Sequence, residues 1–102
     1  MNPIIENKRA EIVSLCEQFA VRRLEIFGSA TRDDFNPARS DVDLLVEFGY
    51  SDTLRALQQY FGLKDALEGV LGRPVDLVES TAVKNPYVRK SIDESREPLY
   101  AA

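Results

Sequence analysis

The spacing of hydrophobic and polar residues changes several times along the chain, and each change marks a new element. Apolar residues recur at helical spacing between charged ones over residues 4–20, which predicts an amphipathic helix. Residues 23–27 alternate polar and apolar positions and stop at Gly28, as a short half-buried strand does. The next segment, 28–40, is rich in Ser, Thr, Asp, Asn and Arg, which predicts a loop with one helical turn after Ser29.

The second half of the chain again passes from strand to helix. Residues 41–48 are rich in valine and leucine and predict a second strand. Leucines at helical spacing then predict a helix that ends at Gly72, and renewed alternation over 75–79 predicts a third strand. Asn85, followed by a proline, predicts the start of a last helix over 86–95. The other expected landmarks are Ser51 or Asp52 as the cap of the long helix, Gly62 as a break in it, and Leu99 and Tyr100 as contacts that hold the tail to the core.

These elements define a fold class. Their order is helix, strand, loop, strand, helix, strand, helix, without an internal repeat or a linker. The helix between the second and third strands can act as a crossover, whereas a loop joins the first two strands. We therefore expect an α/β (α+β) fold with a small mixed sheet of about three strands flanked by helices. At 102 residues the chain has room for a single domain, 1–102.

The composition of the chain limits where the protein can act in the cell and which residue types can carry its chemistry. A net charge of −4 opposes contact with a nucleic-acid backbone, so no stable nucleic-acid binding is expected. No apolar run approaches the roughly 20 residues of a membrane span, and the N-terminus lacks the pattern of a secretory signal. These features predict a cytoplasmic protein without a membrane segment. Histidine is absent, so metal binding and acid–base chemistry fall to carboxylates, and the single cysteine, Cys16, is expected in the core.

Three aspartates are the candidates for that chemistry. Asp41 and Asp43 are two residues apart on a strand, so both side chains leave one face, with Cα atoms about 6–7 Å apart. A divalent cation would offset their repulsion, and hard oxygen ligands favour Mg²⁺ or Mn²⁺. If the third strand lies beside the second, Asp76 can complete the metal site or accept a proton from an attacking hydroxyl. The alternative for all three is an ordinary aspartate on a solvated strand.

A glycine and a serine, Gly28 and Ser29, directly follow the first strand. At such a position backbone N–H groups can approach a phosphate, especially where a helix begins. Gly-Ser pairs are also common in ordinary turns, so this pair gains meaning only together with the aspartates.

Three runs together carry a family resemblance: Phe-Gly-Ser-Ala-Thr-Arg at 27–32, Ser-Asp-Val-Asp-Leu-Leu-Val at 40–46, and Val-Asp-Leu-Val at 75–78. In combination they resemble the signature of the nucleotidyltransferase superfamily to which DNA polymerase beta belongs. The chain is most similar to the minimal nucleotidyltransferases, the MNT antitoxins usually paired with a HEPN-domain toxin, and the similarity runs essentially end to end. The resemblance implies the nucleotidyltransferase fold.

The resemblance also implies roles for individual residues. Asp41 and Asp43 would hold two Mg²⁺ ions, and Asp76 would complete the triad and activate the acceptor hydroxyl. The triphosphate would be held by Gly28 and Ser29. One further residue falls at a position that is often basic in the family, Arg32, which can pair with phosphate or remain solvated.

The implied reaction is in-line attack by an acceptor hydroxyl on the α-phosphorus of ATP or another NTP, with pyrophosphate leaving. In the resembled antitoxins the nucleotide is ATP, and the acceptor is a tyrosine of the HEPN toxin, which AMP attachment neutralises. A hetero-oligomer with that toxin is therefore implied. Two alternatives stay open: a module that binds the toxin without catalysis, and nucleotidyl transfer to a small molecule.

Overall fold

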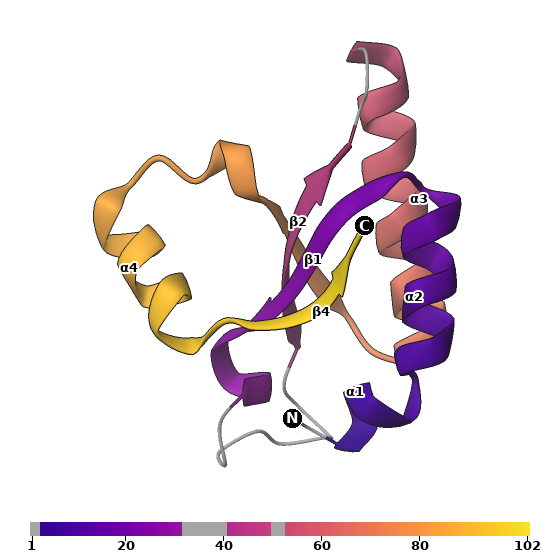
Figure 1. Cartoon of the computed structure of the whole chain (residues 1–102), viewed down its shortest axis with the longest axis horizontal. Coiled ribbons are helices and arrows are strands. Elements are labelled where there is room, and N and C mark those ends of the chain that lie inside the picture. The colour runs from indigo at the N-terminus through magenta and orange to yellow at the C-terminus, as the bar shows by residue number, and fades with distance from the viewer. Residues whose placement is uncertain (1–2, 32–40, 50–52) are drawn as a thin grey trace.

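The computed structural model describes residues 3–31, 41–49 and 53–102 (Figure 1). Among these residues, no helix has both the length and the apolar character that crossing a membrane requires. The elements, in chain order, are α1 (Pro3–Asn7), α2 (Arg9–Gln18), β1 (Val21–Phe27), the 3-10 turn η1 (Gly28–Thr31), β2 (Val42–Phe48), α3 (Thr53–Leu71), β3 (Val75–Glu79), the 3-10 turn η2 (Ser80–Ala82), α4 (Pro86–Ser95) and β4 (Glu97–Ala101).

The described strands form one mixed sheet of four strands in the order β3-β2-β1-β4. β1 is antiparallel to both β2 and β4, and β2 is parallel to β3. The crossover from β2 to β3 is made by α3, because parallel strands cannot be joined by a short turn. The predicted mixed sheet flanked by helices is confirmed, with one strand more than expected. The additional strand is β4, which places Leu99 in the core.

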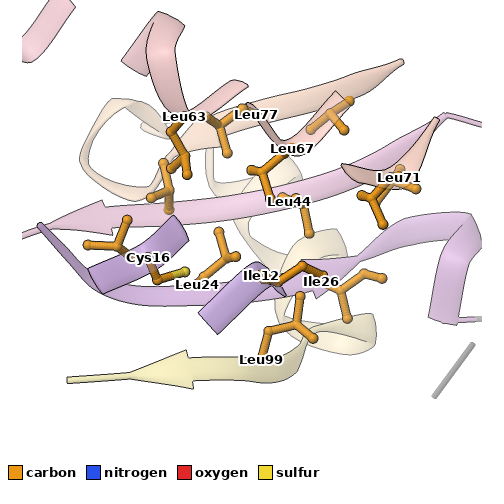
Figure 2. Close-up of a cluster of buried hydrophobic side chains, with 14 of the residues drawn as sticks. Ile12, Cys16, Leu24, Ile26, Leu44, Leu63, Leu67, Leu71, Leu77 and Leu99 are labelled. Carbon is orange, nitrogen blue, oxygen red and sulfur yellow. The ribbon is translucent and has the colours of Figure 1, made fainter. Parts of the chain in front are cut away.

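The two faces of the sheet differ. α2 and α3 cover one face, and α4 lies on the opposite side (Figure 1). Ile12 of α2, Leu67 of α3 and Leu44 of β2 belong to one buried apolar cluster between the sheet and the first two of these helices (Figure 2). Successive side chains of a strand point to opposite faces, so Asp43 and Leu45, on either side of Leu44, face the α4 side.

The predicted helix over 4–20 is two helices, because the chain turns at Lys8, where φ is −109° and ψ is 9°. The turn separates α1 from α2 and allows Ile5 and Ile12, one from each helix, to be fully buried. Cys16 is fully buried in the same core, as predicted.

α3 runs without interruption through Gly62, so the expected break there is wrong. The glycine serves packing instead, because a Cβ at this position would lie 2.7 Å from Cε1 of the Phe19 ring. The predicted end of the helix at Gly72 is confirmed, and this glycine has a left-handed backbone with φ of +66°. The expected cap residues that lie outside the described residues are Ser51 and Asp52.

Short sequence signals are sufficient to place β3 and α4. β3 and α4 span the predicted residues 75–79 and 86–95. Asn85 caps α4, since its Oδ1 accepts the backbone N–H of Tyr87 at 2.9 Å and that of Val88 at 3.4 Å.

Candidate functional site

The central feature of the site is a pair of aspartates on neighbouring strands. Asp43 of β2 and Asp76 of β3 are direct partners in the parallel register. Adjacent strands lie about 4.8 Å apart, and residues in register direct their side chains to the same face. Asp43 is half-buried and Asp76 is exposed, and both are on the α4 side of the sheet. Two like charges therefore stand side by side, an arrangement that a bound cation would stabilise.

Asp41 lies one residue before β2 and is exposed. Its spacing from Asp43 gives it the same side-chain parity. In the described part of the chain, no three His, Cys, Asp or Glu side chains gather closely enough to enclose a metal ion. Mg²⁺ does not need such a cage, because it usually retains several waters and binds one or two carboxylates together with substrate phosphates. The in-register pair of hard oxygen donors fits that kind of ion.

Gly28 approaches this pair from β1. Phe27, the last residue of β1, is the register partner of Asp43, so the turn that follows lies beside the Asp43 side chain. Gly28 has a left-handed backbone with φ of +74°, and a Cβ there would overlap Oδ2 of Asp43. Only glycine leaves this space to the carboxylate without backbone strain.

Two hydrogen bonds hold Gly28 in place. Its backbone N–H donates to Oγ of Ser95, the last residue of α4, at 3.0 Å. Its carbonyl accepts the Thr31 hydroxyl at 2.7 Å. The Gly28 amide that was expected to face a phosphate thus donates to a protein hydroxyl here. Ser95 carried no functional signal in the sequence.

The other predicted site residues are placed less completely. Ser29 lies in η1, directly after Gly28. Arg32, the remaining candidate for phosphate contact, lies outside the described residues. The structure therefore brings together Asp43, Asp76 and Gly28, with Asp41 one step before the strand.

A small polar cavity of about 130 Å³ opens on the same face of the sheet, farther along β1 and β2. Two ion pairs balance its charges: Arg23 lies 2.9 Å from Glu47, and Arg96 lies 3.7 Å from Glu25. No residue of this cavity was singled out in the sequence, because paired charges on a half-exposed strand are ordinary surface features. The cavity is lined by Arg23, Glu25, Leu45, Val46, Glu47, Ser80 and Arg96.

A carboxylate pair on neighbouring strands, beside a glycine turn that admits close approach, defines a site suited to metal-assisted transfer of phosphate-containing groups. Residues 11–99 match the profile of the family described as nucleotidyltransferase domain. The chain belongs to this family, and the prediction of a nucleotidyltransferase is confirmed.

Relatives and solved structures support the same family. A candidate protein adenylyltransferase of Methanocaldococcus jannaschii is 44% identical over 81 residues, which cover 78% of each chain. The solved structure of a candidate minimal nucleotidyltransferase superposes with a TM-score of 0.77 at 33% identity, covering 96% of both chains. A chain from the structure of a tri-AMPylated Shewanella oneidensis HEPN toxin in complex with MNT antitoxin gives a TM-score of 0.66 at 17% identity, covering 95% of this chain and 72% of that one. At that identity the last likeness concerns the fold alone.

Proposed function

We propose that this chain is a Mg²⁺-dependent protein adenylyltransferase that moves AMP from ATP to a tyrosine hydroxyl of a HEPN toxin and so acts as its antitoxin in the cytoplasm. The observation that carries the proposal is the in-register pair of Asp43 and Asp76, with Gly28 against the Asp43 side chain. The candidate protein adenylyltransferase relative supports AMP as the transferred group, and the complex of an AMPylated HEPN toxin with an MNT antitoxin, which shares the fold of this chain, supports a HEPN toxin as the partner.

Each site residue has a role in this proposal. Asp43, together with Asp41 and Asp76, would hold two Mg²⁺ ions, for which Mn²⁺ can substitute. The bound ions would supply the charge that lowers the pKa of the attacking oxygen and stabilises the pyrophosphate leaving group. The turn at Gly28 and Ser29 would receive the triphosphate.

Proton transfer falls to a carboxylate in this chain, which contains no histidine. Asp76 is exposed and reachable by an incoming hydroxyl, so its carboxylate accepts the hydroxyl proton as the new bond to the α-phosphorus forms. The bond between the α-phosphorus and the bridging oxygen breaks, and pyrophosphate leaves. Arg32 would pair with a phosphate during this step.

The test is a transfer assay with ATP labelled at the α-phosphate, Mg²⁺ and the partner toxin. Asp43→Asn and Asp76→Asn should each lower the rate of labelling by about 100-fold or more, the range found when an electrostatic contact to the transition state is removed. Asp65→Asn is a matched control, because Asp65 is an exposed carboxylate on α3, on the other face of the sheet. It should label the toxin at the rate of the unmodified chain.

A binding measurement separates the cation site from the transfer step. Mg²⁺ with a non-hydrolysable ATP analogue should raise the melting temperature of the unmodified chain and of Asp65→Asn, but not that of Asp43→Asn. Toxin inhibition by Asp43→Asn without nucleotide would instead favour the binding module. Label that appears only on small molecules would favour the small-molecule transferase.

A further inference from the structure

The C-terminal end of α4 is tied to the turn beside the aspartate pair. The two segments are 67 residues apart in sequence, and Ser95 joins them by accepting the Gly28 amide at 3.0 Å. The Ser95 hydroxyl proton is directed to the carbonyl of Ser91, one helical turn earlier, at 3.4 Å. A serine hydroxyl has one proton and two lone pairs, so it can make both contacts at once. Ser95 thus connects the end of a helix to the Gly28 backbone.

Gly28, which Ser95 holds, lies next to the Asp43 side chain. Its backbone has a φ of +74°, and because it lacks the Cβ that would overlap Oδ2 of Asp43, it leaves this space to the carboxylate. Rotation of the Gly28 peptide would move the turn relative to that carboxylate. The Thr31 hydroxyl restrains the carbonyl side of the residue, and Ser95 restrains the amide side. Without Ser95, the half-buried amide would have to find another acceptor, and the turn would lose the restraint on its amide side.

Contacts other than the Ser95 hydrogen bond also attach α4 to the rest of the chain. Ile92 is 3% exposed and packs α4 against the rest of the chain. Arg89 donates to the carbonyl of Ser80 at 2.7 Å and holds the helix to η2. Removing the Ser95 hydroxyl leaves both anchors intact. The effect is therefore expected at Gly28 and Asp43, not in the attachment of the helix.

We propose that Ser95 is a positioning residue of the transfer site, whose hydroxyl holds the Gly28 amide and thereby sets the place of the Asp43 carboxylate. The proposal rests on the proposed function, because it assigns Asp43 to the bound cation. In this role Ser95 acts through the Gly28 backbone, not through a contact of its own with the nucleotide or the acceptor. Its loss should slow transfer and raise the Mg²⁺ concentration needed for half-maximal rate.

Three variants test the role. Ser95→Ala removes the hydroxyl, Ser95→Thr retains it, and Ser91→Ala is the matched control, an exposed serine on the same helix. Hydrogen exchange of the Gly28 amide is measured by NMR, and transfer to the toxin is measured as kcat, KM for ATP and Mg²⁺ dependence. In Ser95→Ala the Gly28 amide proton should exchange faster, and kcat should fall by about 10-fold, because small displacements of a reacting group slow a reaction strongly. Ser95→Thr and Ser91→Ala should keep the protection and the rate.

The two proposals fail in different ways. If the unmodified chain does not label the toxin, the proposed function fails, while Gly28 exchange and the Mg²⁺-dependent binding of the ATP analogue still test Ser95. If Ser95→Ala keeps both the Gly28 protection and the Mg²⁺ dependence of the unmodified chain, the positioning role is refuted. Equal impairment in Ser95→Ala and Ser91→Ala, or in Ser95→Ala and Ser95→Thr, also refutes it, because the hydroxyl of Ser95 would then not be the cause.

Discussion

Gly28 and Gly72 both have left-handed backbones, with φ of +74° and +66°, but their surroundings differ. A Cβ at Gly72 would meet nothing within 4 Å, whereas a Cβ at Gly28 would overlap Oδ2 of Asp43 and lie 3.3 Å from its Cγ. Substitution by alanine therefore imposes the same backbone strain at both positions and displaces a carboxylate at only one. Comparison of the two variants isolates the contact with Asp43.

The magnitudes follow from this geometry. Holding an alanine in the left-handed region costs about 1–2 kcal/mol, which applies to both Gly28→Ala and Gly72→Ala. At Gly28 the Asp43 side chain must also leave its place, which adds about 0.5–1.5 kcal/mol if it is forced from its preferred rotamer. For a domain of this size, each kcal/mol lowers the melting temperature by about 4–8 °C. Both variants should thus melt at lower temperature, and Gly28→Ala at the lower of the two.

Activity should separate the variants far more than stability does. Displacement of the Asp43 carboxylate by about 1 Å can cost a factor of about 100 in rate. Gly28→Ala should therefore transfer AMP about 100-fold more slowly at a temperature where it remains folded, while Gly72→Ala retains the rate of the unmodified chain. The assay is labelling of the toxin from ATP, with the folded fraction measured by circular dichroism at the same temperature.

Two outcomes would contradict this reasoning. If Gly28→Ala labels the toxin as fast as Gly72→Ala, close approach of residue 28 to Asp43 has no part in transfer. If Gly72→Ala is slowed as strongly as Gly28→Ala, general strain accounts for the loss and the contact with the carboxylate does not.

Two further predictions concern the core. Gly62→Ala should destabilise the chain by about 1–2 kcal/mol, because overpacking against the Phe19 ring outweighs the gain in helix propensity. Gly69→Ala, whose Cβ would meet nothing within 4 Å, should instead stabilise the chain by about 1 kcal/mol. Urea unfolding measures both free energies, and equal stability of the two variants would contradict the packing argument. Burial, and to a lesser degree the charge of Glu17, raise the pKa of the Cys16 thiol to about 12. The folded state therefore holds the thiol proton more tightly than the unfolded state, so this contribution to stability is full below pH 9 and is lost as the pH rises toward 12. A thiol reagent at pH 8 should react with Cys16 only when the chain unfolds. Rapid reaction of the native chain would refute the assignment of Cys16 to the buried core.

Local signals predicted the elements whose ends are set by neighbouring residues. Asn85 and the proline after it were enough to place α4, because capping and a fixed proline φ act within one helical turn. Alternation alone placed β3. Gly72 ends α3 with the left-handed backbone that its residue type favours. In these cases the physical cause and its effect are only a few residues apart.

Elements that depend on distant contacts were predicted less well. β4 is short and contains Pro98, which cannot donate to a ladder and argues against a strand when it is considered alone. Pairing with β1 at the edge of the sheet determines its conformation. The same applies to Gly62, which is a poor helix former but lies within α3, where the Phe19 ring occupies the space that a Cβ would need.

The candidate site combines both situations. Spacing along a single strand was sufficient to group Asp41 with Asp43, since the period of a strand is local. The adjacency of Asp76 to Asp43 required β3 to lie beside β2, a condition that the crossover helix made reasonable and the observed register satisfies. Ser95 had no such signal, because a serine at the end of a helix is common and its acceptor role exists only once the chain has folded back onto Gly28. A sequence motif therefore reveals the charged groups of the site, whereas the residues that hold these groups in place are found from the contacts of the folded chain. Removal of the Ser95 hydroxyl measures how much one such contact contributes to transfer.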